Sequence, residues 1–507
     1  MPDIDSSFLA MPLRGLAGAA LERAQELGAE HADFRLERIR TGHLSLRDAK
    51  LDSSGDREDI GLCVRVVHDG TWGFASGIAR TSDSAAALAE QAIATARTSR
   101  ALRREPVELA AEQVYDDVSW ISSYDIDPFT VPEAERVARL AELSERLLAA
   151  DGVDHVDASV TQVLENKFYA DTAGTMATQQ RVRVEPEFAA VRVDRAGGSF
   201  DSMRTLAPPA GRGWEYLVGT GWDFDAELAE LPGLLAEHAK APSVEAGDYD
   251  LVIDPTNLWL TIHESIGHAT ELDRALGYEA AYAGTSFATL DRLNSLQYGS
   301  AIMNVTGDRT AEHALATIGY DDEGAAGQQF DIVRDGVLVG YQVNRQMARA
   351  NADRLVASGE RSNGCAYADS PGHIPLQRMA NVSLRPAPDG PSLEQLISGV
   401  ERGILVKGDR SWSIDMQRFN FQFTAQQFHR IENGLLAGQL RDVAYQATTT
   451  DFWGSMEVVG GPQTYQLGGA FNCGKGQPGQ IAPVSHGCPA ALFRGVRILN
   501  TRHEGGR

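Results

Sequence analysis

The sequence lacks the features of membrane and secreted proteins. It has no apolar run close to the ~18 residues that a membrane-spanning helix needs. Residues 1–14 include Asp3 and Asp5 and lack the basic region and apolar stretch of a secretory signal. Four cysteines in 507 residues are too few for a disulfide framework. We therefore expect a soluble protein of the cytoplasm.

Positive charge is also scarce. The chain has 46 Lys and Arg against 70 Asp and Glu, a formal net charge of −24. This balance argues against binding of DNA or RNA through a phosphate-neutralising surface, and residues 100–104 form the one basic cluster. A hydrophobic content of 43% excludes a disordered chain, and at about 150 residues per domain the length predicts two to four domains.

The first half of the chain contains one pattern twice. An expected helix at 15–27 precedes several strand-like runs and a helix at 84–100, and the same order returns between helices at 132–150 and 226–240. The expected strands are 32–36, 41–47, 60–69 and 71–76, and then 155–161, 166–171, 176–184 and 188–194. We predict an N-terminal α/β domain over 1–240, with an internal duplication of 15–104 and 132–240.

The pattern changes after a linker at 240–247. A short apolar strand at 249–253 and one strong helix are followed by strand-like runs and turns. Asp335-Gly336 and Asn433-Gly434 each separate two such runs and are typical two-residue hairpin turns, because these residues tolerate positive φ. We expect 248–507 to be a β-rich domain.

The strong helix carries a motif suited to metal chemistry. Asp254 can cap it and Pro255 fits its first turn. His263 and His268 flank Glu264, and imidazole ligands beside a carboxylate are typical of zinc hydrolases. On a regular helix, positions five apart point about 140° away from each other. Binding of one zinc ion by both histidines therefore requires a π-bulge at 265–267, where Gly267 makes distortion easier.

A catalytic zinc needs a third protein ligand, and the sequence offers two cysteines. Cys473 is the better candidate because glycines surround it and Lys475 can lower its thiol pKa, although it can also be a loop cysteine without a role. Cys488 is the competing ligand, and the nearby His486 belongs to the same site or is a surface residue. Glu271 can be a fourth ligand, a carboxylate that orients an imidazole, or a solvated or capping residue.

Four motifs, in order along the chain, resemble those of the TldD/PmbA (TldD/TldE) metallopeptidases, on the side of the catalytic TldD subunit. They are His263-Glu264-Ser265-Ile266-Gly267-His268 with Glu271, Asp321-Asp322-Glu323-Gly324, Ile431-Glu432-Asn433-Gly434 and Asn472-Cys473-Gly474-Lys475. The resemblance extends to 28–33 and 73–75 in the N-terminal half.

This resemblance implies zinc held by His263, His268 and Cys473, with Glu264 as the general base. It also implies a TldE/PmbA-like paralogue without the metal motif as partner, in a heterodimer that encloses a cavity for extended peptides; a homodimer is the alternative. The predicted fold class is α+β, a duplicated N-terminal α/β domain followed by a β-rich C-terminal domain with one metal-binding helix.

The resulting hypothesis is a zinc-dependent peptidase (a metallopeptidase) for unfolded or extended peptides, in which zinc and Glu264 activate water. We expect no nucleic-acid or membrane partner. Two alternatives stay open, namely a non-catalytic regulatory or binding subunit and a zinc amidohydrolase acting on small molecules.

Overall fold

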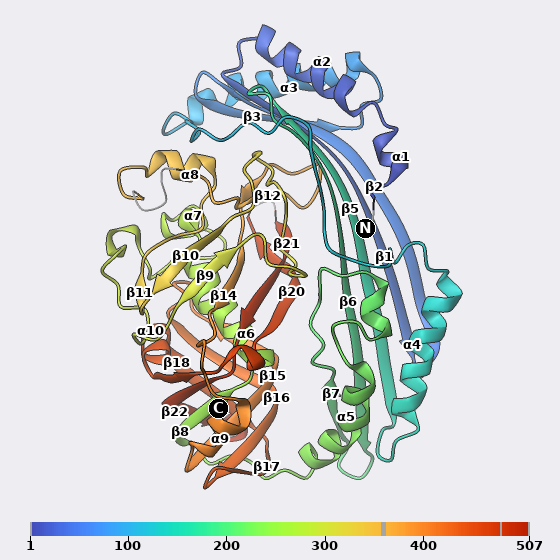
Figure 1. Ribbon diagram of the computed structural model, residues 1–507, viewed down its shortest axis with the longest axis vertical. Helices are drawn as coiled ribbons and strands as arrows, with labels where there is room; N and C mark the ends of the chain where they lie inside the picture. Colours follow the sequence, from blue (N-terminus) through green and yellow to red (C-terminus); the bar gives the residue numbers. More distant parts are fainter. Residues whose placement is uncertain (1–2, 356–360, 477–478, 505–507) are drawn as a thin grey trace.

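The chain folds into two parts that lie side by side (Figure 1). The computed structural model describes residues 3–355, 361–476 and 479–504. The N-terminal part is a long sheet with helices at both ends, and the C-terminal part is rich in strands. The predicted α+β class is confirmed. In these ranges no helix combines the length and the apolar character needed to cross a membrane.

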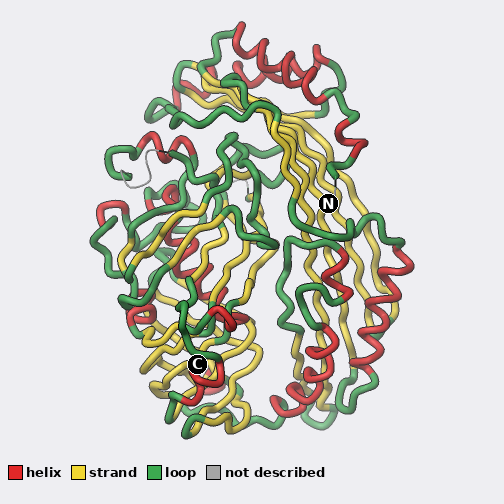
Figure 2. Tube along the Cα trace, viewed as in Figure 1, coloured by secondary structure: helices red, strands yellow, loops and turns green. Residues whose placement is uncertain are grey.

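Four long antiparallel strands form the centre of the N-terminal sheet (Figure 2). They are β1 (His31–Arg47), β2 (Lys50–His68), β5 (His155–Asp171) and β6 (Met176–Asp194). The prediction of two shorter strands in place of β1, and likewise of β5 and β6, was wrong. The strands are continuous because β1 and β5 stay paired from Asp33↔Asp171 to Arg47↔Asp157, so polar residues between the apolar runs still join the ladder.

Shorter strands and helices complete this part. The sheet order is β3-β2-β1-β5-β6, with β4 and β7 both beside β6. Helices α2 and α3 lie together at one end of the long strands, and α4 and α5 at the other (Figure 1). Their bounds are β3 (Thr71–Gly77), β4 (Val118–Ile121), β7 (Ser199–Arg204), α1 (Ser6–Leu9), α2 (Leu13–Glu26), α3 (Ser82–Ser99), α4 (Glu133–Leu148) and α5 (Phe224–His238). The internal duplication and the domain boundary stay predictions.

The main sheet of the C-terminal part closes on itself. Its order is β15-β8-β22-β18-β16-β17, and β15 also pairs with β16. Strands β8 and β15 run parallel, and the other neighbours antiparallel. The bounds are β8 (Gly247–Ile253), β15 (Arg402–Ile414), β16 (Asn420–Glu432), β17 (Leu435–Leu440), β18 (Val443–Thr448), β19 (Met456–Val459) and β22 (Ala491–Asn500). Helix α6 (Pro255–Ile262) is buried along its whole length between β15 and the β20–β21 hairpin.

Among the described residues, three smaller sheets complete the C-terminal part. They are β11-β10-β9-β14, β12-β13 and β20-β21. The bounds are β9 (Val305–Asp308), β10 (Gln329–Arg334), β11 (Val337–Leu338), β12 (Ala366–Tyr367), β13 (Leu376–Gln377), β14 (Asn381–Leu384), β20 (Gln466–Lys475), β21 (Gln480–Cys488), α7 (Leu272–Ala275), α8 (Arg345–Ala350), α9 (Leu393–Ser398), α10 (Thr449–Gly454) and α11 (Thr501–Glu504). Both predicted hairpin turns are confirmed, with φ of 49° and 78° at Asp335-Gly336 and 47° and 78° at Asn433-Gly434.

Buried ion pairs join the two parts of the molecule. Lys167 Nζ on β5 lies 2.7 Å from Asp322 Oδ1, and Arg65 Nη1 on β2 lies 3.0 Å from Glu323 Oε1. Arg35 on β1 also contacts Asp322, at 3.4 Å. We call Arg35, Arg65, Lys167, Asp322 and Glu323 the ionic seam. The Asp321–Gly324 motif therefore attaches the C-terminal part to the long sheet.

Candidate metal centre

The helix that carries the histidines changes its winding at the motif. Thr256 N donates to Asp254 Oδ1 at 3.0 Å, which gives α6 its predicted cap, and Pro255 occupies the first turn. Residues His263–Gly267 then form a π-helical turn, in which His268 N donates to the carbonyl oxygen of His263 five positions back. The predicted irregularity is confirmed. It brings the two imidazoles to one side, with ring centroids 4.7 Å apart.

The glycine in this turn lies against a flexible side chain. A Cβ atom on Gly267 would lie 2.5 Å from Met379 Sδ and 2.9 Å from its Cε. A larger residue at this position would therefore displace the end of the Met379 side chain, which is flexible, so this close approach does not by itself require glycine.

Three potential metal donors meet beside this turn. A nitrogen from each of His263 and His268 and Cys473 Sγ all lie within 4.8 Å of one another, and all three side chains are buried. Cys473 Sγ on β20 is 3.7 Å from His268 Nε2. Cys488 is outside this cluster, because its thiol donates to the carbonyl oxygen of Pro255. Of the two candidate cysteines, Cys473 is therefore the one that lies beside the two histidines.

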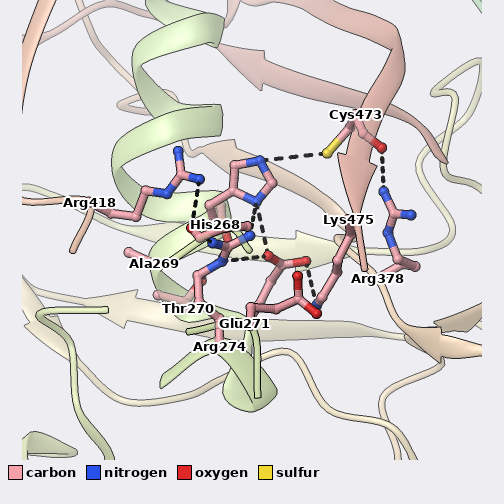
Figure 3. Close-up of polar contacts among 12 residues, drawn as sticks. His268, Ala269, Thr270, Glu271, Arg274, Arg378, Arg418, Cys473 and Lys475 are labelled. Atoms are coloured by element: carbon pink, nitrogen blue, oxygen red, sulfur yellow. Dashed lines mark hydrogen bonds and ion pairs between the residues drawn. The ribbon is translucent and has the colours of Figure 1, made fainter. Parts of the chain in front are cut away.

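Glu271 orients the imidazole of His268 (Figure 3). Its Oε2 lies 2.9 Å from His268 Nδ1, and its Oε1 lies 3.1 Å from Lys475 Nζ. Burial alone would raise the pKa of Glu271, but Lys475, His268 and Arg274 hold this pKa well below its usual range. The carboxylate is thus ionised and accepts a hydrogen bond from Nδ1–H of His268. Of the roles considered for Glu271, the structure favours imidazole orientation.

The thiol of Cys473 is influenced by a different group than expected. Lys475 Nζ contacts Glu271, Asp273 and Gln377. Burial acts to raise the pKa of Cys473, but the charge and hydrogen bond of His268 outweigh burial and place this pKa below its usual value. This environment favours the thiolate, the form of cysteine that binds metals.

Two contacts of the site had no clear signal in the sequence. Arg418, in the turn between β15 and β16, donates from Nη1 to Glu264 Oε2 at 2.6 Å, and so provides the cation that a buried Glu264 needs. His486 is fully buried rather than on the surface, and its Nε2 lies 2.7 Å from His263 Nδ1. The His486-Gly487-Cys488 sequence was interpreted as a loop near the site, but these residues lie on β21, and the contact with His263 was not predicted.

The donor cluster opens into a cavity between the two parts of the molecule. The cavity has a volume of about 300 Å³, and His263, Glu264, His268 and Cys473 all line it. Glu185 to Glu187 of β6 and Gly468 and Gly469 of β20 form other walls. A buried carboxylate and three soft or borderline donors on a cavity wall are suited to metal-assisted hydrolysis.

Comparison with known proteins identifies the class. The family model described as "PmbA/TldA metallopeptidase C-terminal domain" matches residues 246–500, and "PmbA/TldA metallopeptidase domain 1" matches residues 32–96. The first match alone covers half of the chain, including the candidate metal centre. The chain belongs to the TldD/PmbA family of metallopeptidases.

Relatives match over nearly their whole length. A metalloprotease of Methanothermobacter thermautotrophicus is 26% identical, with 93% of this chain and 96% of the relative covered. A zinc metalloprotease TldD homolog of Saccharolobus solfataricus is 22% identical, with coverage of 94% and 98%. The crystal structure of TldE from Thermococcus kodakarensis shares the fold, with a TM-score of 0.71, 15% identity and coverage of 95% and 99%.

Proposed function

We propose that this chain is a zinc-dependent peptidase that hydrolyses unfolded or extended peptides. The observation that carries the proposal is the convergence of His263, His268 and Cys473 within 4.8 Å, on the wall of a cavity that Glu264 also lines. The membership of a metallopeptidase family supports a metal-dependent reaction.

The donor set fits zinc. Imidazole nitrogen and thiolate sulfur suit this borderline-soft ion better than magnesium or calcium, which prefer oxygen. Glu271 and His486 each contact the Nδ1 atom of one histidine, so Nε2 is the nitrogen left for a metal on both rings. Three protein ligands and one open position are the pattern of catalytic rather than structural zinc sites.

Glu264 is the proposed general base. A zinc ion bound by these residues would polarise the scissile carbonyl and lower the pKa of water. Glu264 accepts a proton from water as the water oxygen bonds to the carbonyl carbon. It then delivers this proton to the amide nitrogen as the C–N bond breaks, which leaves a carboxylic acid and an amine. Arg418 donates a hydrogen bond to Glu264 Oε2, so we expect Oε1 to be the oxygen that accepts and delivers the proton.

The walls of the cavity support an extended substrate. Strand β20, which carries Cys473, has β21 as its pairing partner among the described strands, so its other edge can accept the backbone of a peptide. Backbone pairing of this kind tolerates many side chains. A cavity of about 300 Å³ between two parts of the molecule would admit an unfolded segment and exclude a folded protein.

We also propose that the chain acts with a TldE/PmbA-like paralogue, or as a homodimer. The shared fold with TldE supports a pair of related subunits. The mass of the complex isolated from cells, measured by light scattering, distinguishes a heterodimer from a homodimer and from a single chain.

The test is peptide hydrolysis by the full-length chain, purified with its partner, with zinc content measured on the same samples. We expect the wild type to cleave an unstructured peptide and to contain zinc. Glu264→Gln should keep the zinc and lose activity by about 10²- to 10⁴-fold, because a general base is removed while the three donors remain. Cys473→Ser should lose both zinc and activity.

Three other outcomes would contradict the proposal. Undiminished turnover in both variants would exclude this site as the reaction centre. A zinc-free wild type without activity would indicate the regulatory subunit, and hydrolysis of small amides without cleavage of peptides would indicate the amidohydrolase.

A further inference from the structure

His486 connects the backbone of one strand to a histidine of the candidate metal centre. It lies on β21, fully buried, with Nδ1 2.8 Å from the carbonyl oxygen of Val382 on β14. Its Nε2 lies 2.7 Å from His263 Nδ1. Three groups therefore form a continuous chain of hydrogen bonds that runs from a backbone carbonyl, through His486, to His263.

The direction of these hydrogen bonds follows from the carbonyl. A carbonyl oxygen can only accept, so His486 Nδ1 must carry a hydrogen. No carboxylate of the described residues hydrogen-bonds to His486, and its complete burial disfavours the charged form, so the ring is neutral and carries hydrogen on one nitrogen only. His486 Nε2 is then an acceptor, and His263 Nδ1 must donate to it. The remaining nitrogen of His263, Nε2, keeps a free lone pair.

We infer that His486 is a positioning residue that fixes His263 in the tautomer able to bind a metal through Nε2. The inference rests on the proposed zinc site, and it assigns this role to a residue that would itself not touch the metal. The two imidazoles thereby differ in the group that accepts the hydrogen bond of Nδ1. For His268 it is a carboxylate, and for His263 it is a neutral ring.

The packing around His486 keeps its ring in place. Trp259 of α6 stacks on it, with ring centroids 6.2 Å apart and an interplanar angle of 10°. His486 also pairs with Gly468 across the β20–β21 hairpin, the same hairpin that carries Cys473. One hairpin thus supplies both the sulfur donor and the support of His263, so their positions are set together.

Two amide substitutions test the direction of the hydrogen bond. In His486→Gln the amide oxygen lies as many bonds from Cβ as Nε2 does, so it can still accept from His263 Nδ1. In His486→Asn the amide reaches the position of Nδ1 and not that of Nε2. Zinc affinity of the full-length chain, measured by competition with a chelator, should stay within about 3-fold of wild type for Gln. It should fall by about 10- to 100-fold for Asn and for His486→Leu.

A second measurement does not depend on zinc. Nitrogen NMR of the metal-free chain with labelled histidine should show His263 as the Nδ1–H tautomer in wild type and in His486→Gln. His486→Asn should show a mixture or the Nε2–H form. The signal of His263 is identified by its loss in His263→Ala, and thermal unfolding confirms that each variant is folded.

These outcomes separate the inference from the proposed function. Equal zinc affinity in wild type and all three folded His486 variants would overturn the inference and leave the zinc site standing. A wild type that binds no zinc would overturn the proposed function, and the tautomer measured in the metal-free chain would then decide the inference alone. An Nε2–H tautomer of His263 in the wild type contradicts it.

Discussion

The candidate metal centre and the ionic seam both bury several charged side chains. They differ in how far apart in the sequence the contacting residues lie. In the candidate metal centre, His268 is oriented by Glu271, which follows it by three residues. In the seam, Lys167 meets Asp322 across 155 residues of sequence. A local motif can therefore specify how His268 points, whereas the seam depends on how two parts of the molecule pack.

Breaking the seam should have the largest effect on stability. Lys167 is buried, and its ammonium lies 2.7 Å from Asp322, 3.5 Å from Glu37 and 3.7 Å from Glu165. Lys167→Met keeps most of the side-chain volume but leaves these carboxylates with less compensating charge. We expect the free energy of unfolding, measured in denaturant, to fall by about 3–5 kcal/mol. Zinc affinity of the folded variant should stay at the wild-type value. A loss below about 1 kcal/mol would contradict the role of the seam.

Removing the charge of Glu271 should have a smaller effect, and we expect it on zinc affinity rather than on stability. Glu271→Gln keeps an acceptor for His268 Nδ1 but removes the negative charge that supports this imidazole. We expect zinc affinity to weaken by about 10- to 100-fold in a chelator competition. Asp273→Asn is a matched control, because this carboxylate also contacts Lys475 but not His268. Equal losses in both variants would show that the general charge balance, rather than imidazole orientation, matters.

An exposed ion pair on the same sheet should have the smallest effect. Arg40 on β1 and Asp56 on β2 form two hydrogen bonds of 2.9 and 2.6 Å, but both side chains are about two-fifths exposed. Asp56→Asn should change the free energy of unfolding by less than about 1 kcal/mol, because water screens the pair. A change as large as that of Lys167→Met would show that burial does not distinguish the two sites.

The sequence predicted the irregular turn of the histidine motif better than it predicted the long sheet. The spacing of His263 and His268 required a π-turn, since a regular helix would separate the rings, and the turn is present. The first half of β2 was not predicted, because residues 52–59 are polar. In the structure these residues lie within the paired part of β1 and β2. Sequence spacing cannot show such pairing, which depends on a neighbouring strand.

The partners of the site residues were harder to predict than the residues themselves. Arg418 reaches Glu264 across 154 positions, and His486 reaches His263 across 223. Both contacts form only when β15, β16 and β21 pack around α6. Single residues in turns and strands carry no periodicity that would indicate such contacts.

X-ray absorption at the zinc edge of the full-length protein can show whether His263, His268 and Cys473 bind one zinc ion together. We expect bound zinc with one sulfur neighbour at about 2.3 Å and two imidazole nitrogens at about 2.0–2.1 Å. The sulfur signal should disappear in any zinc that Cys473→Ser retains. A zinc shell without sulfur in the wild type, or a shell unchanged by Cys473→Ser, would contradict this expectation.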